Sequence, residues 1–584
     1  MSEAPPTQIF SDQQWQSLLP VLKGLKEPQR LWLSGYLAAM STPSVGTATG
    51  QQAADPVTIA YGTETDNCKH LAQELEKLCT EQGIGAQVVD LGQLRLRRLP
   101  RLKHFIVITA THGDGDPPEP VADFFDALMS DDAPRVDDMK FAVLALGDSS
   151  YELFCVTGQA IDKRLEELGG SRLIPRRDCD VDFQKPAREW MQELLPTLPR
   201  AGAQDQAVNG ATTSMPTAEA STEYSKTNPL EVEVLANRSL SHADRLRPVH
   251  HLELDLSDAQ LPLQPGDAVG ITPDNPPDLV ARLLDLAGCS GDSPVMIDEK
   301  ALPLVEALRS HRDLTIAARG FLPFWAALSG EASLTAIVEA ETATQRAFLR
   351  DHQILDIMLL APARPEPQEL VDNLRPLQPR LYDLANCLET LDDELHLTVK
   401  DFRYSFGTRE EKGIASSYLL DLQPGDTLRV YPHRNARFHL PEETEAPIIL
   451  IGEGTGIAPY RAFLQRLQAT TPKRRCWMVF AEKSFEEDFL YQIDIQQALS
   501  EGALSELDTV FYNDQPDRRL ADPLLQNLDR LTAWLAEDAH IYLCGEKQPL
   551  AECEAALEQK LDEVHSSGYW KQLSKSKRVH RNVY

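Results

Sequence analysis

Three short segments carry hydroxyl, amide and aromatic side chains that could hold a phosphorylated ring compound. Residues 62–67 (GTETDN) follow the apolar run VTIAY and offer hydroxyls and backbone N–H groups at an expected helix start, which suits a phosphate dianion. Residues 111–119 (THGDGDPPE) follow FIVITA, and residues 147–155 (GDSSYELFC) follow FAVLAL. Each loop alone is better explained as a helix cap or turn. All three at adjacent strand ends favour a ligand site, because ligands of doubly wound domains bind outside the carboxyl ends of the strands.

Further along the chain, two segments are suited to a pyrophosphate. The Arg380 guanidinium can donate two parallel hydrogen bonds to phosphate oxygens, and residues 413–417 (GIASS) place small residues and free N–H groups at a helix start. Residues 448–459 (IILIGEGTGIAP) predict a strand, a glycine-rich turn and a helix start, where a backbone without side chains can approach another pyrophosphate. Each pattern is weak alone, so the prediction of several nucleotide sites depends on their occurring together.

The elements that must position these segments fall into three units. Residues 57–200 alternate apolar runs with helical patterns, which indicates an α/β domain with a parallel sheet. Residues 228–445 show alternating strands with the phrase LQPGD at 263 and 422, which predicts a β-barrel, and a helical insertion at about 276–375 interrupts it. Residues 446–584 again alternate apolar runs with helices, so we expect a second parallel α/β domain.

The remaining segments and the composition limit the choice of partners. Residues 1–40 predict two short amphipathic helices, and residues 41–56 and 201–227 lack Leu, Ile, Phe and Trp and are interpreted as linkers. The net charge of -32 disfavours nucleic acid and anionic membrane, and no apolar run is long enough to cross a bilayer. The nine cysteines are scattered without CxxC spacing, so we expect no metal cluster. Without a visible secretory signal, the expected compartment is the cytoplasm.

In this order, the motifs resemble those of the diflavin reductase family. The resemblance covers essentially the whole chain and implies an α/β multidomain protein: a flavodoxin-like FMN domain, an FAD-binding barrel related to ferredoxin reductases, and a Rossmann-like nicotinamide domain. It implies FMN, FAD and NADPH as cofactors, with NADH as an open alternative. It also implies hydride transfer to FAD beside Cys544 and Asp383, which are the catalytic residues expected from the resemblance.

The resemblance also implies which residues bind each cofactor. The FMN-binding residues would be Thr63, Glu64, Thr65, Asp66, Asn67, Cys68, Ala110, Thr111, His112, Gly113, Leu146, Gly147, Asp148, Ser149, Ser150, Tyr151, Glu152, Leu153, Phe154 and Cys155, with Tyr151 stacked on the flavin. The FAD-binding residues would be Arg380, Leu381, Tyr382, Asp383, Thr398, Val399, Lys400, Tyr404, Gly413, Ile414, Ala415, Ser416 and the terminal Tyr584. The NADP-binding residues would be Gly454, Thr455, Gly456, Tyr512, Asn513, Arg518 and Arg519.

At three positions the chain departs from the family pattern. Asp66 replaces a glycine beside the FMN phosphate, which its charge would repel. Asp383 replaces a serine near FAD, and an ionised carboxylate about 4 Å from the flavin would disfavour added negative charge by roughly 4 kcal/mol, or about 90 mV for two electrons. Tyr512 and Asn513 stand where the family places Ser-Arg against the 2'-phosphate, so Arg518 and Arg519 would have to hold it.

The N-terminal segment, with WLSGY at 32–36, resembles the branch of the family that serves sulfite reductases. That resemblance implies a siroheme and iron–sulfur hemoprotein as the electron acceptor, and a homo-oligomer assembled through this segment. Two alternatives remain open. One is a reductase for another acceptor, and the other is a degenerate paralogue with a binding or structural role, which Asp66, Asp383 and Tyr512 together would explain.

Overall fold

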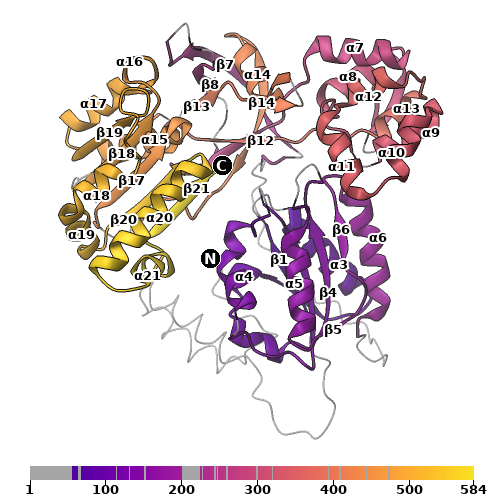
Figure 1. Cartoon of the computed structure of the whole chain (residues 1–584), viewed down its shortest axis with the longest axis horizontal. Helices are drawn as coiled ribbons and strands as arrows, with labels where there is room; N and C mark the ends of the chain where they lie inside the picture. The colour runs from indigo at the N-terminus through magenta and orange to yellow at the C-terminus, as the bar shows by residue number, and fades with distance from the viewer. Residues whose placement is uncertain are drawn as a thin grey trace, which may run out of the picture.

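The computed structural model describes residues 56–199 and 224–584, apart from residues 64–66, 113–114, 131, 150–152, 227, 243–244, 246, 258, 260, 298–299, 319, 392, 407–408, 442–444 and 471–473. The N-terminal segment and almost all of both predicted linkers therefore lie outside the described residues. So do seven of the predicted FMN-binding residues: Glu64, Thr65, Asp66, Gly113, Ser150, Tyr151 and Glu152. The described chain forms two α/β units, an antiparallel sheet and a group of helices (Figure 1).

The first unit is a parallel sheet in the order β2-β1-β3-β4-β5, with β6 also paired to β4. Its central strands are mostly apolar and buried, as expected for a sheet with helices on both faces. This arrangement confirms the predicted doubly wound domain. The elements are β1 (Val57–Gly62), α3 (Asn67–Glu81), β2 (Ala86–Asp90), β3 (His104–Ala110), α4 (Ala122–Met129), β4 (Lys140–Leu146), α5 (Val156–Glu167), β5 (Ser171–Arg172), β6 (Arg177–Cys179) and α6 (Gln184–Leu194), with 3-10 turns at Leu91–Gln93, Leu96–Arg101, Glu119–Val121 and Leu195–Thr197.

The middle unit is an antiparallel sheet in the order β12-β9-β16-β7-β8-β13. Its end strands meet only through an isolated bridge between Leu384 and Leu397, so the described strands do not close the predicted barrel. Both LQPGD phrases form the expected turns, in which Asp267 and Asp426 accept hydrogen bonds from the backbone N–H three residues earlier. The elements are β7 (Leu230–Ser239), β8 (Val249–Asp255), β9 (Ala268–Ile271), β12 (Arg380–Asp383), β13 (Glu394–Lys400), β14 (Arg403–Phe406), β15 (Arg409–Lys412), α14 (Ile414–Asp421) and β16 (Thr427–His433).

Helices fill the insertion between β9 and β12, as the sequence predicts. They surround a separate apolar core that includes the fully buried Phe321 and Trp325. The elements are α7 (Pro277–Ala287), β10 (Pro294–Ile297), β11 (Lys300–Pro303), α8 (Leu304–Ser310), α9 (Phe321–Ser329), α10 (Ala332–Glu339), α11 (Thr342–Asp351), α12 (Ile354–Leu360) and α13 (Pro367–Asp372). Figure 1 shows this helical group beside the first unit, so the two units can share contacts.

The last unit is a second parallel sheet, in the order β19-β18-β17-β20-β21, with apolar cores on both faces. Its final strand brings the carboxyl terminus to the edge that faces the antiparallel sheet (Figure 1). Within the described ranges, no helix is both long and apolar enough to cross a bilayer. The elements are β17 (Ile448–Glu453), a 3-10 turn (Gly454–Gly456), α15 (Ile457–Ala469), β18 (Cys476–Glu482), α16 (Phe485–Asp488), α17 (Gln492–Ser500), β19 (Glu506–Phe511), α18 (Asp522–Gln526), α19 (Leu528–Ala536), β20 (His540–Gly545), α20 (Lys547–Val564), α21 (Tyr569–Lys575) and β21 (Val579–Val583).

Candidate redox site

The predicted FMN loops lie at one edge of the first sheet, because β1, β3 and β4 run parallel and end together. Thr63 follows β1 and is buried just before α3 begins at Asn67. The second loop is tied to the start of α5, directly after the third loop, since the Thr157 backbone N–H donates a hydrogen bond to Thr111 Oγ1 (3.2 Å). The structure thus brings the described parts of all three loops to one place, as a flavin phosphate and ring would require.

Within the third loop, some residues face the ligand edge and others belong to the core. Ser149 donates its backbone N–H to Asp180 (3.0 Å), and Leu153 is 47% exposed at the surface. Cys155 and Cys68 are fully buried, and burial raises the pKa of the Cys68 thiol to about 12. Both cysteines therefore pack in the core behind the loops, and their thiols are uncharged at neutral pH.

The predicted FAD segments lie on β12 and at the start of α14. The Arg380 guanidinium is exposed and donates only to the carbonyls of Gln378 and Pro379, and no described carboxylate lies within ion-pair distance of it. At the start of α14, the Ser416 hydroxyl donates to the Gly413 carbonyl (3.1 Å). The neighbouring Ser417 Oγ is buried and has no hydrogen-bond partner among the described residues. An exposed guanidinium without a described ion-pair partner and an unpartnered hydroxyl near a helix start fit a diphosphate group.

The other predicted FAD residues have more varied surroundings. The Thr398 hydroxyl is hydrogen-bonded to the Tyr491 hydroxyl (2.7 Å), and Val399 is fully buried in the core of the sheet. Lys400 pairs with Glu546 of the nicotinamide domain (2.7 Å), and the Tyr404 hydroxyl accepts a hydrogen bond from Gln353 (3.2 Å). The side chains of Thr398, Val399 and Lys400 therefore contact other parts of the protein. Any contact of these residues with a flavin would be made by their backbone atoms.

Asp383, at the end of β12, meets the end of the nicotinamide sheet. Its Oδ2 lies 4.0 Å from the Cys544 sulfur, and both carboxylate oxygens lie 2.9 Å from the Asn582 amide nitrogen, which donates to them. Burial raises the pKa of Asp383 to about 6, although the Asn582 hydrogen bond opposes this shift. Burial and the adjacent Asp383 raise the pKa of Cys544 well above its ordinary value, so its thiol is protonated near neutral pH.

The terminal Tyr584 completes this cluster. Its backbone N–H donates to the Gly545 carbonyl (3.1 Å), and its hydroxyl is hydrogen-bonded to Thr455 in the glycine-rich turn (2.7 Å). The side chain is nevertheless 53% exposed. A ring that is anchored at both ends but open on its surface is suited to stacking against a flat partner.

Sequence reasoning missed the carboxylates beside the glycine-rich turn. Glu453 is buried, and burial together with Glu546 and Glu482 raises its pKa to about 7. Tyr512 donates its hydroxyl to Glu453 (3.3 Å), the residue that directly precedes the glycine-rich turn. The raised pKa keeps much of the negative charge off Glu453 near neutral pH, which reduces repulsion of a bound pyrophosphate.

Glu453 also provides a test of pH-dependent stability. Its folded-state pKa lies above the unfolded value, so the stability it contributes is fully present below about pH 4.5 and is lost as the pH rises through about 7. We therefore expect Glu453→Gln to stabilise the C-terminal domain by up to about 3 kcal/mol at pH 8. Calorimetric unfolding at pH 5 and pH 8 would measure this, with the exposed Glu552→Gln as control. An equal gain at both pH values would contradict the assignment.

The residues predicted to select the coenzyme lie after β19. The Asp514 carboxylate, whose charge would repel a 2'-phosphate, accepts a hydrogen bond from the Phe485 backbone N–H (2.8 Å). Arg518 donates to the side chains of Gln515 and Gln526, and Arg519 donates to backbone carbonyls. Among the described residues, neither guanidinium has a carboxylate within ion-pair distance. Both can therefore bind a phosphate without breaking an internal ion pair.

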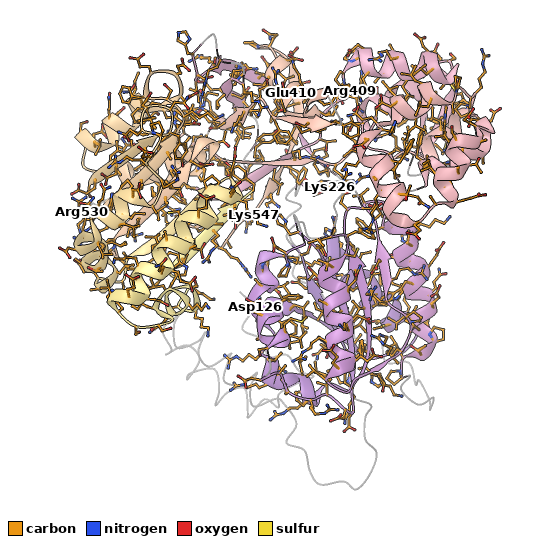
Figure 2. All side chains as sticks on the ribbon, viewed as in Figure 1. Asp126, Lys226, Arg409, Glu410, Arg530 and Lys547 are labelled. Carbon is orange, nitrogen blue, oxygen red and sulfur yellow. The ribbon has the colours of Figure 1, made fainter. Side chains whose placement is uncertain are left out.

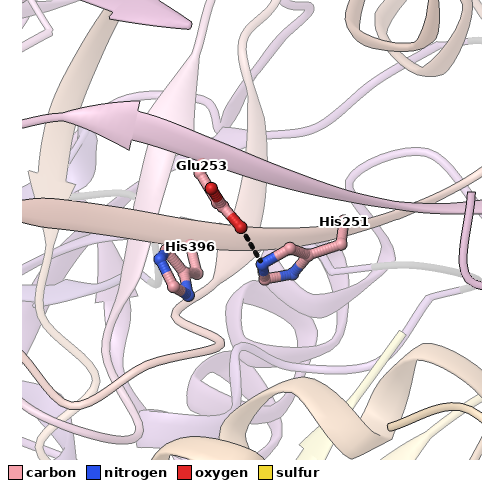
Figure 3. A group of neighbouring side chains, drawn as sticks. All are labelled: His251, Glu253 and His396. Carbon is pink, nitrogen blue, oxygen red and sulfur yellow. Dashed lines mark ion pairs between the residues drawn. The ribbon is translucent and has the colours of Figure 1, made fainter. Parts of the chain in front are cut away.

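The side chains of His251, Glu253 and His396 lie close together on two neighbouring strands of the antiparallel sheet (Figure 3), and the two histidines are buried. Their ligand atoms lie within 4.8 Å of one another, which is a spacing compatible with a metal ion. However, the Arg461 guanidinium is 3.2 Å from His396 Nδ1, and a fixed positive charge there opposes a cation. His251 Nδ1 is hydrogen-bonded to the Tyr491 hydroxyl (2.8 Å). We therefore assign the group to the contact between the two domains.

Among the described residues, two ion pairs connect the first unit to the rest of the molecule. Arg375, which precedes β12, is only 4% exposed and pairs with Asp148 of the third loop (2.7 Å). Lys547, at the start of α20, pairs with Asp116 of the second loop, and Figure 2 shows it on the side that faces the first unit. Both carboxylates come from the predicted FMN loops. The contacts therefore hold these loops against the other two domains.

The comparisons with known proteins agree with this architecture. Residues 59–190 match the flavodoxin family model, residues 222–418 the FAD binding domain model, and residues 450–555 the oxidoreductase NAD-binding domain model. Together with the three predicted cofactor sites, these domains define a flavoprotein oxidoreductase with two flavin-binding domains.

Relatives of similar length identify the family more closely. The sulfite reductase [NADPH] flavoprotein alpha-component of Bacillus subtilis (strain 168) is 36% identical, with 98% of each chain covered. The protein of the same name from Cronobacter sakazakii is 35% identical, with 100% of each chain covered. The chain belongs to the sulfite reductase flavoprotein alpha-component family.

Proposed function

We propose that this protein passes electrons from NADPH through FAD and FMN to a hemoprotein that reduces sulfite to sulfide. The observation that carries this proposal is the meeting of Asp383 with Cys544 and Asn582 at the boundary between the FAD and nicotinamide domains. The domain order and the names of the full-length relatives support the coenzyme and the acceptor.

The residues that would hold each cofactor have chemistry that fits it. Arg380, Gly413 and Ser417 would bind the FAD diphosphate, and the loops after β1, β3 and β4 would bind FMN. When bound, NADPH supplies a hydride with both electrons of its C–H bond, FAD accepts it, and FMN delivers the electrons singly. The protein's own residues orient these groups. Tyr584 would cover the flavin ring, and the protonated Cys544 thiol would lie beside the coenzyme ring.

Arg518 is the residue we expect to select NADPH over NADH. A guanidinium can donate two parallel hydrogen bonds to the 2'-phosphate, which NADH lacks. Arg518→Ala should raise the KM for NADPH roughly tenfold and leave the KM for NADH nearly unchanged. Steady-state rates with both coenzymes would measure the change, with Arg530→Ala as control because that guanidinium instead pairs with Glu506 and lies over the Trp477 ring. A similar loss with both coenzymes would contradict the assignment.

The acceptor and the assembly are further parts of this proposal. The N-terminal segment at 1–40 would assemble the subunits and dock a siroheme and iron–sulfur hemoprotein in the cytoplasm. Purified protein mixed with such a hemoprotein should produce sulfide from sulfite with NADPH as the reductant. NADPH oxidation with artificial acceptors, but no sulfide, would instead favour a reductase for another acceptor. A protein without flavin would favour the degenerate paralogue.

A further inference from the structure

We propose that Asn582 is a positioning residue that holds the Asp383 carboxylate beside the Cys544 sulfur, on the side where the coenzyme ring would lie. The proposal rests on the proposed hydride transfer at this site. It extends that function by identifying a residue that no cofactor motif includes.

The contacts of Asn582 define its role. It lies on β21, in register with Cys544 on the neighbouring β20. Its side-chain nitrogen lies 2.9 Å from each oxygen of Asp383 and 3.7 Å from the Cys544 sulfur. Asn582 thus donates from the nicotinamide domain to a carboxylate of the antiparallel sheet. This arrangement fixes the direction of the carboxylate and the spacing of the two domains at the same point.

The position of the Asp383 carboxylate matters for the chemistry of hydride loss. A reduced nicotinamide that gives up a hydride is left with a positive charge on its ring, and a nearby carboxylate stabilises that charge as it develops. The same carboxylate would disfavour negative charge on FAD, so its placement matters for both partners. An Asp383 side chain without its amide partner could turn toward the flavin or take up a proton.

Asp383 has few groups that can oppose a proton. From the nicotinamide domain it faces the Cys544 thiol, the Asn582 amide and the Tyr584 phenol. Asn582 is the neighbour that lowers its pKa, against the larger effect of burial. Removal of the amide should therefore raise the pKa of Asp383 above about 6, so that the carboxylate is lost at a higher pH.

The test compares the full-length, flavin-loaded Asn582→Ala variant with the wild type. We expect hydride transfer at pH 7 to slow about tenfold, as for the loss of one hydrogen bond to a charged group, with little change in KM. The acid limb of the pH profile should move upward by about one unit. Infrared titration of the Asp383 carboxyl in coenzyme-free protein should show the same shift, with Asp383→Asn identifying the band.

Two further variants keep the test decisive. Asn527→Ala removes another half-buried amide of the same domain, bonded to the Pro523 carbonyl (2.9 Å), and should leave the profile unchanged. Asp383→Asn combined with Asn582→Asp exchanges carboxylate and amide and should restore most of the rate lost in Asn582→Ala. An Asn582→Ala protein with unshifted titration and an unshifted acid limb would overturn the proposal. A wild-type protein that fails to oxidise NADPH would instead overturn the proposed function.

Discussion

Arg375→Glu is expected to slow the arrival of electrons at FMN by at least about tenfold, because it removes the cation of a buried ion pair between domains. The remaining Asp148 carboxylate and the carboxylate introduced by the substitution would repel each other at the contact. Nε and Nη1 of Arg375 are also buried without hydrogen-bond partners among the described residues, so the wild-type guanidinium is held in place largely by Asp148. Stopped-flow absorbance after mixing with NADPH would follow the two flavins separately.

The Arg375→Glu variant should also have a more extended arrangement of its domains. Small-angle scattering is expected to show a larger radius of gyration, since loss of the contact favours release of the FMN domain. Arg350→Glu, in the same helical insertion, changes an arginine whose described ionic contact is an exposed one with Asp351 and should have neither effect. Arg375→Asp combined with Asp148→Arg should recover part of the rate. Unchanged scattering and unchanged electron arrival would show that this ion pair does not hold the domain.

Gly456→Ala is expected to abolish reduction by NADPH while both flavins stay bound. A methyl group at this position would lie 2.6 Å from the Cys544 carbonyl carbon and 2.9 Å from the Gly545 nitrogen, and both of these are backbone atoms that cannot turn aside. The turn at 454–456 would have to move away from β20, which carries Cys544. We therefore expect the coenzyme site to lose its shape.

Flavin content and coenzyme binding separate this effect from global misfolding. Released-flavin analysis should match the wild type, whereas equilibrium binding of NADP⁺ should weaken at least about a hundredfold. Gly85→Ala is a matched control, because a methyl group there meets no atom within 4 Å. Normal NADPH oxidation by the Gly456→Ala protein would contradict the close packing of the turn against β20.

Sequence patterns predicted the order of fold types along the chain, because this order depends on local periodicity, whereas the cofactor-binding roles of the loops stay predictions. Strands β1, β3 and β4 are largely buried and mostly apolar, and the loops that follow them must share an edge in a parallel sheet. Barrel closure was a wrong expectation. Alternating strands indicate an antiparallel sheet, but closure depends on how far β12 and β13 pair, and these consecutive strands meet through one bridge.

Residues that act across domain boundaries were missed because their partners are distant in sequence. Asn582 lies two positions before the chain end and contacts Asp383, about two hundred residues earlier. Arg375 and Asp148 are similarly distant. A lone asparagine or arginine has no pattern that reveals such a partner. The substitution at Asp383 was visible, but its meaning depended on the amide that faces it, and Asp66 and Tyr151 lie outside the described residues.

The central claim is that one chain carries both flavins and that NADPH reduces them. Its most direct test is an anaerobic absorbance titration of the purified protein with NADPH, followed by quantification of the released flavins. We expect one FMN and one FAD per chain, with both bleached by NADPH. A colourless protein, or bound flavins that NADPH leaves oxidised, would contradict it.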